Sequence, residues 1–486
     1  MSGPPYHHEL DLPDDHPAAP YHHPRCVLGN RQYVRHVDDL QDNIEIEEVE
    51  EYSINDTFVV EDGEPDNKEE DEDVDTTEGE DDEEDINKED DGEDIYEEDD
   101  KEAEVLQTHA ASFDITKYGA KADDKTDISK AILDVWTKAC AATSPSKITI
   151  PKGSYLLTQV ELKGPCKAPV EIKVEGTVNA PKDPNALKSG NWISIDHVDE
   201  LTISGGGTFD GQGATAWAKN DCSKNTNCKK SMNFGLNVVT NSVVRDVTSK
   251  DSKHFHVNVI GCKNLTFEHF SISAPDESLN TDGIHIGRSN GVNIINSNIK
   301  TGDDCVSIGD GSQNVKVEKL TCGPGHGISI GSLGRYQKED PVIGITIKNC
   351  TLTGTDNGVR VKTWPASPGH SVASGLHFED IIMNNVGNPV LIDQGYCPYN
   401  QCSSKSPSLV KISDVTFKNI RGTTPTKVAV KLVCSSGIPC SNVQVGNIDL
   451  KYSGSDGPAT SECANINPIF SGKQNPPVCK TKAPTS

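Results

Sequence analysis

Residues 280–334 read NTDGIHIGRSNGVNIINSNIKTGDDCVSIGDGSQNVKVEKLTCGPGHGISIGSLG, and the tripeptide RVK follows at residues 360–362. Four short runs of alternating apolar residues accompany the polar signatures: IHI at 284–286, VSI at 306–308, ISI at 328–330 and VRV at 359–361. Asp282, Asp304 and His326 each stand two residues before the first apolar residue of their run, and 22 residues separate successive members. This fixed period predicts structural repeats that stack and bring one polar position of each repeat together.

Similar triplets recur from Trp192 onward, with Gly, Asn, Asp and Ser between them. They include ISI (193–195), LTI (201–203), VNV (257–259), LTF (265–267), VKV (315–317) and ITI (345–347). Alternation at period two turns every second side chain inward, and Gly and Asn tolerate the positive φ of tight corners. The pattern predicts an all-β solenoid with about three short strands per coil, whereas a β-sandwich or propeller would need longer strands or blade-length repeats.

The charge of the chain changes near residue 107. Residues 1–110 contain 41 acidic and 6 basic residues, whereas the remainder contains 34 acidic and 39 basic residues. We predict that residues 1–107 form a disordered acidic tail, because such a composition buries too little apolar surface to offset chain entropy. The tail is either a solvated, removable segment or a polyanion that occupies a basic cleft or binds cations. Residues 108–486 are expected to form one domain whose mild positive charge is ordinary but also suits a polyanionic partner.

An amphipathic helix is predicted just after the tail, within FDITKYGAKADDKTDISKAILDVWTKAC at residues 113–140. Asp127 or Ser129 can cap its N-terminus. Apolar residues at three- and four-residue steps define one face of this helix: Ile128, Ala131, Ile132, Val135 and Trp136. A short helix here would cover the open end of the solenoid, whose first core layer otherwise faces water.

Fourteen of the fifteen cysteines follow residue 110, and only Cys26 lies in the tail. An even number in a Gly- and Asn-rich body predicts disulfides and an oxidising compartment, although spacing alone leaves the connectivity open. The closest pairs are Cys222/Cys228, Cys397/Cys402, Cys434/Cys440 and Cys463/Cys479. No pair has the CxxC spacing of a zinc site, so we expect no metal centre.

The first residues, MSGPPYHHELDLPDDHP, lack the apolar segment of a signal peptide, which conflicts with an oxidising compartment. Either the start belongs to a longer precursor or an altered gene model, or secretion uses another signal. No apolar run reaches the roughly 18 residues of a membrane span. Glycosylation sequons at Asn55, Asn264 and Asn349 fit a secreted protein, but such motifs are common by chance.

The central stretch predicts a cluster of charged groups on one surface. If the coils stack in register, equivalent positions lie ~4.8 Å apart, so Asp282, Asp304 and His326 form a column with Asp303 beside it. Arg360 and Lys362 differ by two residues and point to the same side.

Ionising all three adjacent acids would cost free energy through charge repulsion, so one of them should have a raised pKa and hold a proton. A protonated acid beside an ionised one is what glycoside hydrolysis requires. The two cations point to a sugar that bears a carboxylate, since Arg grips carboxylates through paired hydrogen bonds. Any one of GDD, GHG or NTDG alone would indicate only a turn or a corner. The prediction of an active site depends on the three motifs occurring at the same position of the 22-residue repeat.

The motifs NTDGIHI, GDDCVSIG, GPGHGISIGSLG and RVKTW resemble the four signatures of the polygalacturonases, glycoside hydrolase family 28. The resemblance covers roughly Phe113 to Cys479. It implies a right-handed parallel β-helix that hydrolyses α-1,4-galacturonan with inversion and needs no cofactor. It also implies a secreted, cell-wall enzyme with pectin as substrate, no nucleic-acid or membrane partner, and a monomeric state. Val361 replaces the usual isoleucine between Arg and Lys, which is conservative because it points inward.

The resemblance also implies a role for each site residue. Asp303 resembles the general acid, Asp282 and Asp304 the pair that activates water, and His326 the histidine that supports the acid. The substrate-binding candidates are Arg360, Lys362, Tyr396 and Asn280. Cys305 and Cys322 match a family disulfide, and the other disulfide candidates carried forward are Cys434, Cys440, Cys463 and Cys479. Coil spacing alone would place the carboxyls closer than the 6.5–9.5 Å typical of inverting enzymes, so inversion is adopted from the family.

LIDQGYCPYNQC, at residues 391–402, and GSLGRY resemble the plant branch of the family, especially the pollen exopolygalacturonases, some of which are allergens. We therefore expect exo action from the non-reducing end, with the loop Ala216–Ser231 as a candidate wall across the binding groove. Endo action is the first alternative. A calcium-dependent pectate lyase on the same scaffold would need an Asp-rich calcium site, and a non-catalytic wall-binding or allergenic β-helix would not need the intact acid, His, Arg and Lys set.

Overall fold

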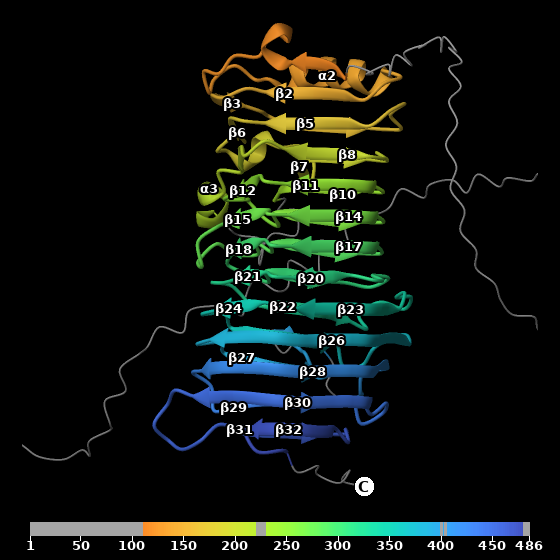
Figure 1. Cartoon of the computed structure of the whole chain (residues 1–486), viewed down its shortest axis with the longest axis vertical. Coiled ribbons are helices and arrows are strands. Elements are labelled where there is room, and N and C mark those ends of the chain that lie inside the picture. Colours follow the sequence, from red (N-terminus) through yellow and green to blue (C-terminus); the bar gives the residue numbers. More distant parts are fainter. Residues whose placement is uncertain (1–109, 220–229, 399–401, 403–405, 480–486) are drawn as a thin grey trace, which may run out of the picture. The chain divides into compact units, whose positions relative to one another are not determined.

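The computed structural model describes residues 110–219, 230–398, 402 and 406–479. Their strands pair in parallel from coil to coil, so that the coils stack along one axis (Figure 1). This is the predicted right-handed parallel β-helix, with two sheets and almost no helix. The disorder predicted for residues 1–107 lies outside the described residues.

The smaller sheet carries one strand from each coil, and its members follow in chain order. They are β4 (Val160–Lys163), β7 (Asn191–Asp196), β10 (Met232–Asn237), β13 (Val257–Ile260), β16 (Ile284–Gly287), β19 (Val306–Ile308), β22 (Ile328–Leu333), β25 (Asn357–Thr363), β27 (Asn388–Asp393), β29 (Val428–Val433) and β31 (Thr460–Ala464). Ile284 pairs with Val306, Val306 with Ile328, and Ile328 with Val359. The 22-residue period is therefore one turn of the β-helix.

The larger sheet contains two ladders side by side. One ladder consists of β1 (Ala111–Asp114), β2 (Ser146–Ile150), β5 (Val170–Val174), β8 (Leu201–Ser204), β11 (Thr240–Arg245), β14 (Lys263–Glu268), β17 (Asn290–Ile295), β20 (Lys316–Glu318), β23 (Val342–Lys348), β26 (Ser371–Asn384), β28 (Val410–Thr424), β30 (Ser441–Tyr452) and β32 (Ile469–Asn475). The other consists of β3 (Ser154–Leu156), β6 (Thr177–Asn179), β9 (Thr208–Asp210), β12 (Thr248–Lys250), β15 (Ser271–Ser273), β18 (Asn298–Lys300), β21 (Thr321–Cys322) and β24 (Thr351–Thr353). Both ladders join in β26, so three strands per coil, as predicted, become two in the last coils.

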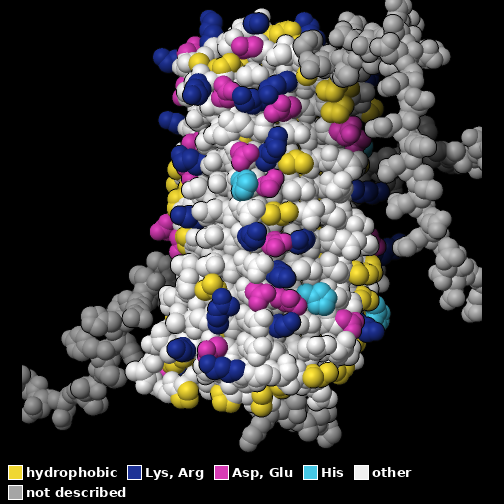
Figure 2. Space-filling model, viewed as in Figure 1, with side chains coloured by type: hydrophobic (Ala, Val, Ile, Leu, Met, Phe, Trp, Pro, Cys, Tyr) yellow, Lys and Arg dark blue, Asp and Glu magenta, His cyan; other side chains and the backbone are white. Residues whose placement is uncertain are grey.

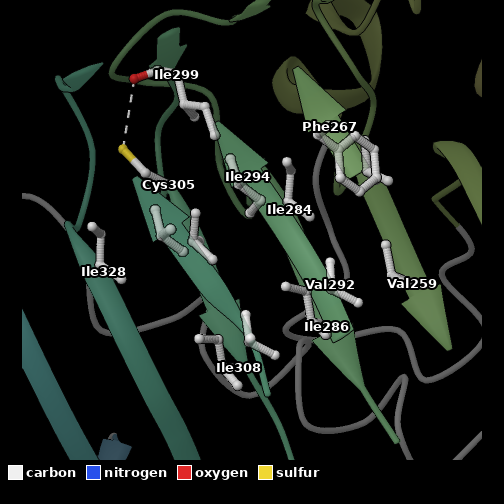
Figure 3. Packing of buried hydrophobic residues seen from close by; sticks show 14 of the residues in the cluster. Val259, Phe267, Ile284, Ile286, Val292, Ile294, Ile299, Cys305, Ile308 and Ile328 are labelled. Carbon is white, nitrogen blue, oxygen red and sulfur yellow. Dashed lines mark hydrogen bonds between the residues drawn. The ribbon is translucent and has the colours of Figure 1, made fainter. Parts of the chain in front are cut away.

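The core is a continuous column of aliphatic side chains between the sheets. Figure 3 shows Ile284 and Ile286 of β16 converging with Val292 and Ile294 of β17. All four are fully buried, as the alternation in the sequence predicts. Aromatic residues also contribute to the core: Phe378 of β26 and Phe417 of β28 stack with ring centroids 4.9 Å apart.

The predicted cap is α2 (Ser129–Ala141), at the N-terminal end of the stack (Figure 1). It buries Ala131, Ile132, Val135, Trp136 and Ala139. The prediction that Asp127 or Ser129 caps this helix was wrong: the N-cap is Ile128, which has no side-chain cap, and Asp127 instead accepts the backbone N–H of Ser129 at 3.0 Å from one residue further back. The other helical segments are short: η1 (Ile115–Tyr118), η2 (Pro184–Ala186) and α3 (Ala214–Ala218). No helix within the described ranges has the length and apolar character needed to cross a membrane.

Five disulfides join described cysteines: Cys140–Cys166, Cys305–Cys322, Cys397–Cys402, Cys434–Cys440 and Cys463–Cys479. Four of these pairs were candidates from the sequence. The fifth, Cys140–Cys166, ties the end of α2 to a coil and was not anticipated, because its 26-residue separation gives no local signal. Cys262 and Cys350 are buried free thiols, and the pair Cys222/Cys228 lies outside the described residues.

Figure 2 shows acidic and basic side chains interspersed over one face of the stack. Ion pairs such as Lys147–Glu171 (3.0 Å) join paired strands of neighbouring coils. At the corners, the Asn264 amide donates to Asn241 at 2.9 Å, and the Asn314 amide to Asn290 at 3.0 Å. These ladders use the left-handed corner residues that the sequence predicted.

The glycines of the GDD and NTDG signatures are needed for close approach between coils. A Cβ at Gly302 would overlap the carbonyl oxygen of Ser278, and one at Gly283 would overlap that of Cys305. Neither neighbour can move, because both are backbone atoms of stacked coils. The acid-bearing corners therefore depend on the missing side chains.

We predict that Gly302→Ala lowers the free energy of unfolding by about 1–3 kcal/mol, because the added methyl forces the corner and the neighbouring coil apart. Gly190→Ala is the matched control, since a Cβ there meets no atom within 4 Å. Denaturant unfolding of both variants measures the difference. Equal stability of the two variants would contradict the steric argument.

Candidate active site

The acidic signatures lie at the corner that leads into the smaller sheet. The backbone N–H of Gly283 donates to the Asp304 carbonyl at 2.9 Å, and that of Cys305 to the Gly327 carbonyl at 2.8 Å. These bonds hold successive corners at the same phase. The predicted column of two acids and a histidine is therefore present, with one member from each coil.

Asp303 and His326 form a close pair. The Nδ1 atom of His326 lies 2.9 Å from Oδ1 of Asp303, and its Nε2 atom lies 3.5 Å from Oδ2 of Asp356. Burial disfavours the imidazolium, but the charge and hydrogen bond of Asp303 outweigh it and raise the pKa of His326 to about 9. Burial likewise opposes ionisation of Asp303, but His326 lowers the pKa of this carboxyl to about 2. The pair therefore carries one proton, held mainly on the imidazole.

Asp304 is held by two cations from the coils that follow. Arg360 Nη2 donates to its Oδ1 at 3.0 Å, and Lys362 Nζ donates to its Oδ2 at 3.1 Å. The hydroxyl of Ser329 also donates to Oδ1 at 2.9 Å, and accepts from Arg360 Nε at 3.0 Å. Both Arg360 and Lys362 are largely buried, so these bonds are made out of water and favour the carboxylate.

Asp282 has a different environment, although it occupies the same position one coil earlier. Its side chain is buried, and Ser307 donates to its Oδ2 at 3.0 Å. No described residue makes a hydrogen bond to its Oδ1. Burial and then the charges of Asp303 and Asp304 raise the pKa of Asp282 well above its ordinary value.

The expectation that one of the three acids has a raised pKa agrees with the structure, but the acid is Asp282. Asp303, the predicted general acid, is the carboxyl with the lowered pKa. The reason is pairing: His326 contacts Asp303 directly, whereas Asp282 receives only a neutral hydroxyl. Sequence spacing shows which acids are neighbours, but it does not show which one the histidine reaches.

The predicted substrate binders surround this cluster. The Tyr396 ring lies over both cations, with its centroid 5.9 Å from Arg360 Cζ and 5.2 Å from Lys362 Nζ. Trp364 packs edge-on against Tyr396 at 6.0 Å between centroids. Asn280 Nδ2 reaches Oδ2 of Asp303 only at 3.5 Å. All of the predicted site residues therefore lie together, with Asn280 beside the acid and Tyr396 beside the cations.

Two serines and a histidine near the acids were missed from the sequence. Ser307 and Ser329 each donate to the acid of the preceding coil, and His285 Nδ1 lies 2.8 Å from the Ser307 hydroxyl. The signal was present, because these residues are the middle members of the triplets IHI, VSI and ISI. Period-two alternation turns exactly those positions outward, and Arg360 is the equivalent residue of VRV.

The ligand atoms of Asp303, Asp304 and His326 lie within 4.8 Å of one another, a spacing that a metal ion could also use. Each group already has partners in the described chain: His326 contacts two carboxylates, and Asp304 contacts two cations. The cluster is therefore balanced in charge without an added ion.

The chain is 59% identical over 360 residues to an exopolygalacturonase of Oenothera organensis, which covers 74% of this chain and 99% of that protein. It is 56% identical over 375 residues to a polygalacturonase of Gossypium hirsutum, which covers 77% and 92%. Among solved structures, an endo-xylogalacturonan hydrolase from Aspergillus tubingensis shares the fold, with a TM-score of 0.64 and 24% identity over 75% of this chain and all of that one.

The family model of the glycosyl hydrolases family 28 matches residues 140–476. This range includes all four polar signatures and every residue of the site described above. The chain therefore belongs to the glycosyl hydrolases family 28.

Proposed function

We propose that the chain is a polygalacturonase that hydrolyses the α-1,4-galacturonosyl bonds of pectin, and that it acts from the non-reducing end. The observation that carries this proposal is the arrangement of Asp304. It lies between the Asp303–His326 pair on one side and the buried cations Arg360 and Lys362 on the other. Proton-transfer groups thus adjoin a site for the carboxylate of an acidic sugar.

The Asp303–His326 pair is proposed as the acid. The shared proton moves from the imidazole to the Asp303 carboxyl and then to the oxygen of the glycosidic bond as that bond breaks. Because the pKa of His326 is raised to about 9, the pair keeps this proton over the whole acidic and neutral range. His326 therefore supports the acid by storing its proton.

Asp282 and Asp304 are proposed to activate the attacking water. They occupy equivalent corners of consecutive coils, and one of them must accept the proton that water loses as its oxygen bonds to the anomeric carbon. Attack from the face opposite the leaving oxygen inverts the configuration. Since burial and the neighbouring carboxylates raise the pKa of Asp282, we expect Asp282 to be protonated, and activity to be lost, at a higher pH than an ordinary carboxyl would set.

Arg360, Lys362 and Tyr396 are proposed to bind the carboxylate of one galacturonate unit. The two cations point to one side of β25, and the Tyr396 ring covers both. Asn280, next to Asp303, is proposed to position the sugar at the bond that is cleaved.

Exo action is supported by the insertion Ala216–Ser231, whose middle, residues 220–229, lies outside the described part of the chain. Trp217 Nε1 donates to the Ser252 carbonyl at 3.0 Å, and Phe234, three residues after the insertion, pairs with Val257, the register partner of Ile284. The described strand that follows the insertion is therefore two coils before β16, the strand that follows Asp282. The relative in Oenothera organensis is likewise named an exopolygalacturonase.

Residues 108–486 are proposed as the catalytic domain, and the enzyme as a monomer of the cell wall. The five disulfides and the plant relatives indicate an extracellular enzyme. Location in the wall follows from the proposed pectin substrate.

We expect the purified chain to release galacturonic acid monomer from polygalacturonate from the first time point, and NMR to show the β-anomer before mutarotation. A wall on the non-reducing side allows only one unit to enter, and inversion converts the α-bond to a β-product. An early ladder of oligomers would instead mean endo action. An α-anomer as first product would contradict the proposed inversion.

Asp303→Asn and Asp282→Asn should both lower kcat, by about 10²- to 10⁴-fold, because each removes a proton-transfer group. Their stabilities at pH 7 should change in opposite directions. Asp303→Asn breaks the ion pair with His326, whereas Asp282→Asn removes a carboxyl that is costly to ionise in the fold. The gain from Asp282→Asn should disappear below about pH 4, where the unfolded Asp is also protonated. Thermal unfolding across pH checks this pair, and destabilisation by both variants would contradict the raised pKa of Asp282.

His326→Gln should be less stable than the wild type, with a loss that depends on pH. The folded pKa of His326 is raised to about 9, so its contribution is complete below its unfolded value near 6.5 and is lost as pH rises through about 9. The folded pKa of Asp303 is lowered to about 2, so its contribution is present above about 4 and is lost as pH falls through about 2. The difference in unfolding free energy should therefore be largest between about pH 4 and 6.5. A difference independent of pH would argue against the ion pair.

A further inference from the structure

The outward face of the smaller sheet carries a second polar column beside the column of acids. His285, Ser307, Ser329 and Arg360 are register partners in four consecutive coils. The two serines in the middle each donate to an acid of the preceding coil, and the two end members each contact one serine. The column is thus a set of hydrogen-bond partners for the catalytic carboxyls.

The two halves of this column are equivalent in geometry but not in charge. Ser329 accepts from the cation Arg360 and donates to Asp304. Ser307 lies 2.8 Å from His285 Nδ1 and donates to Oδ2 of Asp282 at 3.0 Å. A hydroxyl has a single proton, so when Ser307 gives it to ionised Asp282, the short contact to His285 requires a proton on Nδ1.

The imidazole of His285 is neutral and fixed in place. Burial and then the charge of Lys362 lower its pKa to about 4. The Phe255 ring packs against it, with ring centroids 5.5 Å apart. A neutral ring has only one N–H, so Nδ1–H toward Ser307 leaves Nε2 as an acceptor.

We propose that His285 is a positioning residue that acts through Ser307 on Asp282, and that this relay favours the ionised, water-activating form of Asp282. The relay ties Oδ2 of Asp282, and the other oxygen, Oδ1, is buried and makes no hydrogen bond to a described residue. The other charged groups that act on Asp282 are Asp303 and Asp304 from the next coil and Lys362 from β25. The relay rests on the proposed function, because it acts on the proposed water-activating pair.

The test is the pH profile of kcat/KM on polygalacturonate for His285→Asn and His285→Gln. The asparagine amide can occupy the place of Nδ1 and still donate to Ser307, whereas the glutamine amide reaches toward the place of Nε2. We expect His285→Gln to move the acid limb up by about half to one pH unit, which is the effect of one neutral hydrogen bond. His285→Asn should keep the limb within a few tenths of a unit.

The alkaline limb is the internal control, because no contact joins the relay to the Asp303–His326 pair. Ser307→Ala and Ser307→Thr make the same comparison at the serine of the relay, and they test the relay if the His285 variants do not fold. Thr keeps the hydroxyl, so only Ala should move the acid limb. The proposed relay would be contradicted if the acid limb stayed in place in both His285→Gln and Ser307→Ala. It would also be contradicted if the two variants at one position, Asn and Gln at 285 or Ala and Thr at 307, shifted the acid limb equally. Absence of any hydrolysis by the wild type would instead overturn the proposed function.

Discussion

The in-register hydrogen bonding of one coil to the next is the constraint on which the site depends. Parallel strands set equivalent residues ~4.8 Å apart, and the corners before β16, β19 and β22 obey the same rule. Two acids at one phase must therefore be close neighbours, whatever their charges. The backbone bonds that impose this are numerous and lie along the whole stack, whereas the repulsion acts at one place. The fold can thus hold carboxyls together that would separate in a less rigid structure.

Charge pairing then makes the three acids unequal. Asp303 has His326, and Asp304 has Arg360 and Lys362, but Asp282 has only the hydroxyl of Ser307. Each cation comes from a later coil than the acid that it contacts. The partners of a carboxyl are thus set by what the chain places one, two or three coils further on. Burial and then the charges of Asp303 and Asp304 raise the pKa of Asp282, and no cation of the described chain contacts this carboxyl directly to offset them.

Much of this arrangement was predictable from the sequence. The period of 22 residues predicted the length of a coil, and the equivalent positions of Asp282, Asp304 and His326 in that period predicted that they form a column. The two-residue step between Arg360 and Lys362 predicted that both side chains point to the same side of their strand. Contacts that depend on side-chain direction were not predictable. His326 bonds Asp303, which is off the column, because its ring reaches sideways across the corner. The disulfide Cys140–Cys166 was missed because it joins a helix to a coil, where no repeat relates the two cysteines.

Each repeat contributes to the site at two positions: a corner residue and the middle residue of the strand triplet that follows it. The corner residues supply the acids. In the next coil, the strand residue three positions after the equivalent corner residue supplies the group that binds each acid: Ser307 binds Asp282, and Ser329 binds Asp304. A substitution at the strand position of one coil therefore changes the hydrogen bond to the acid of the preceding coil. It follows that the two acids of the water-activating pair can differ in ionisation without any change in their own motif, because the column beside them ends in a neutral histidine on one side and in an arginine on the other.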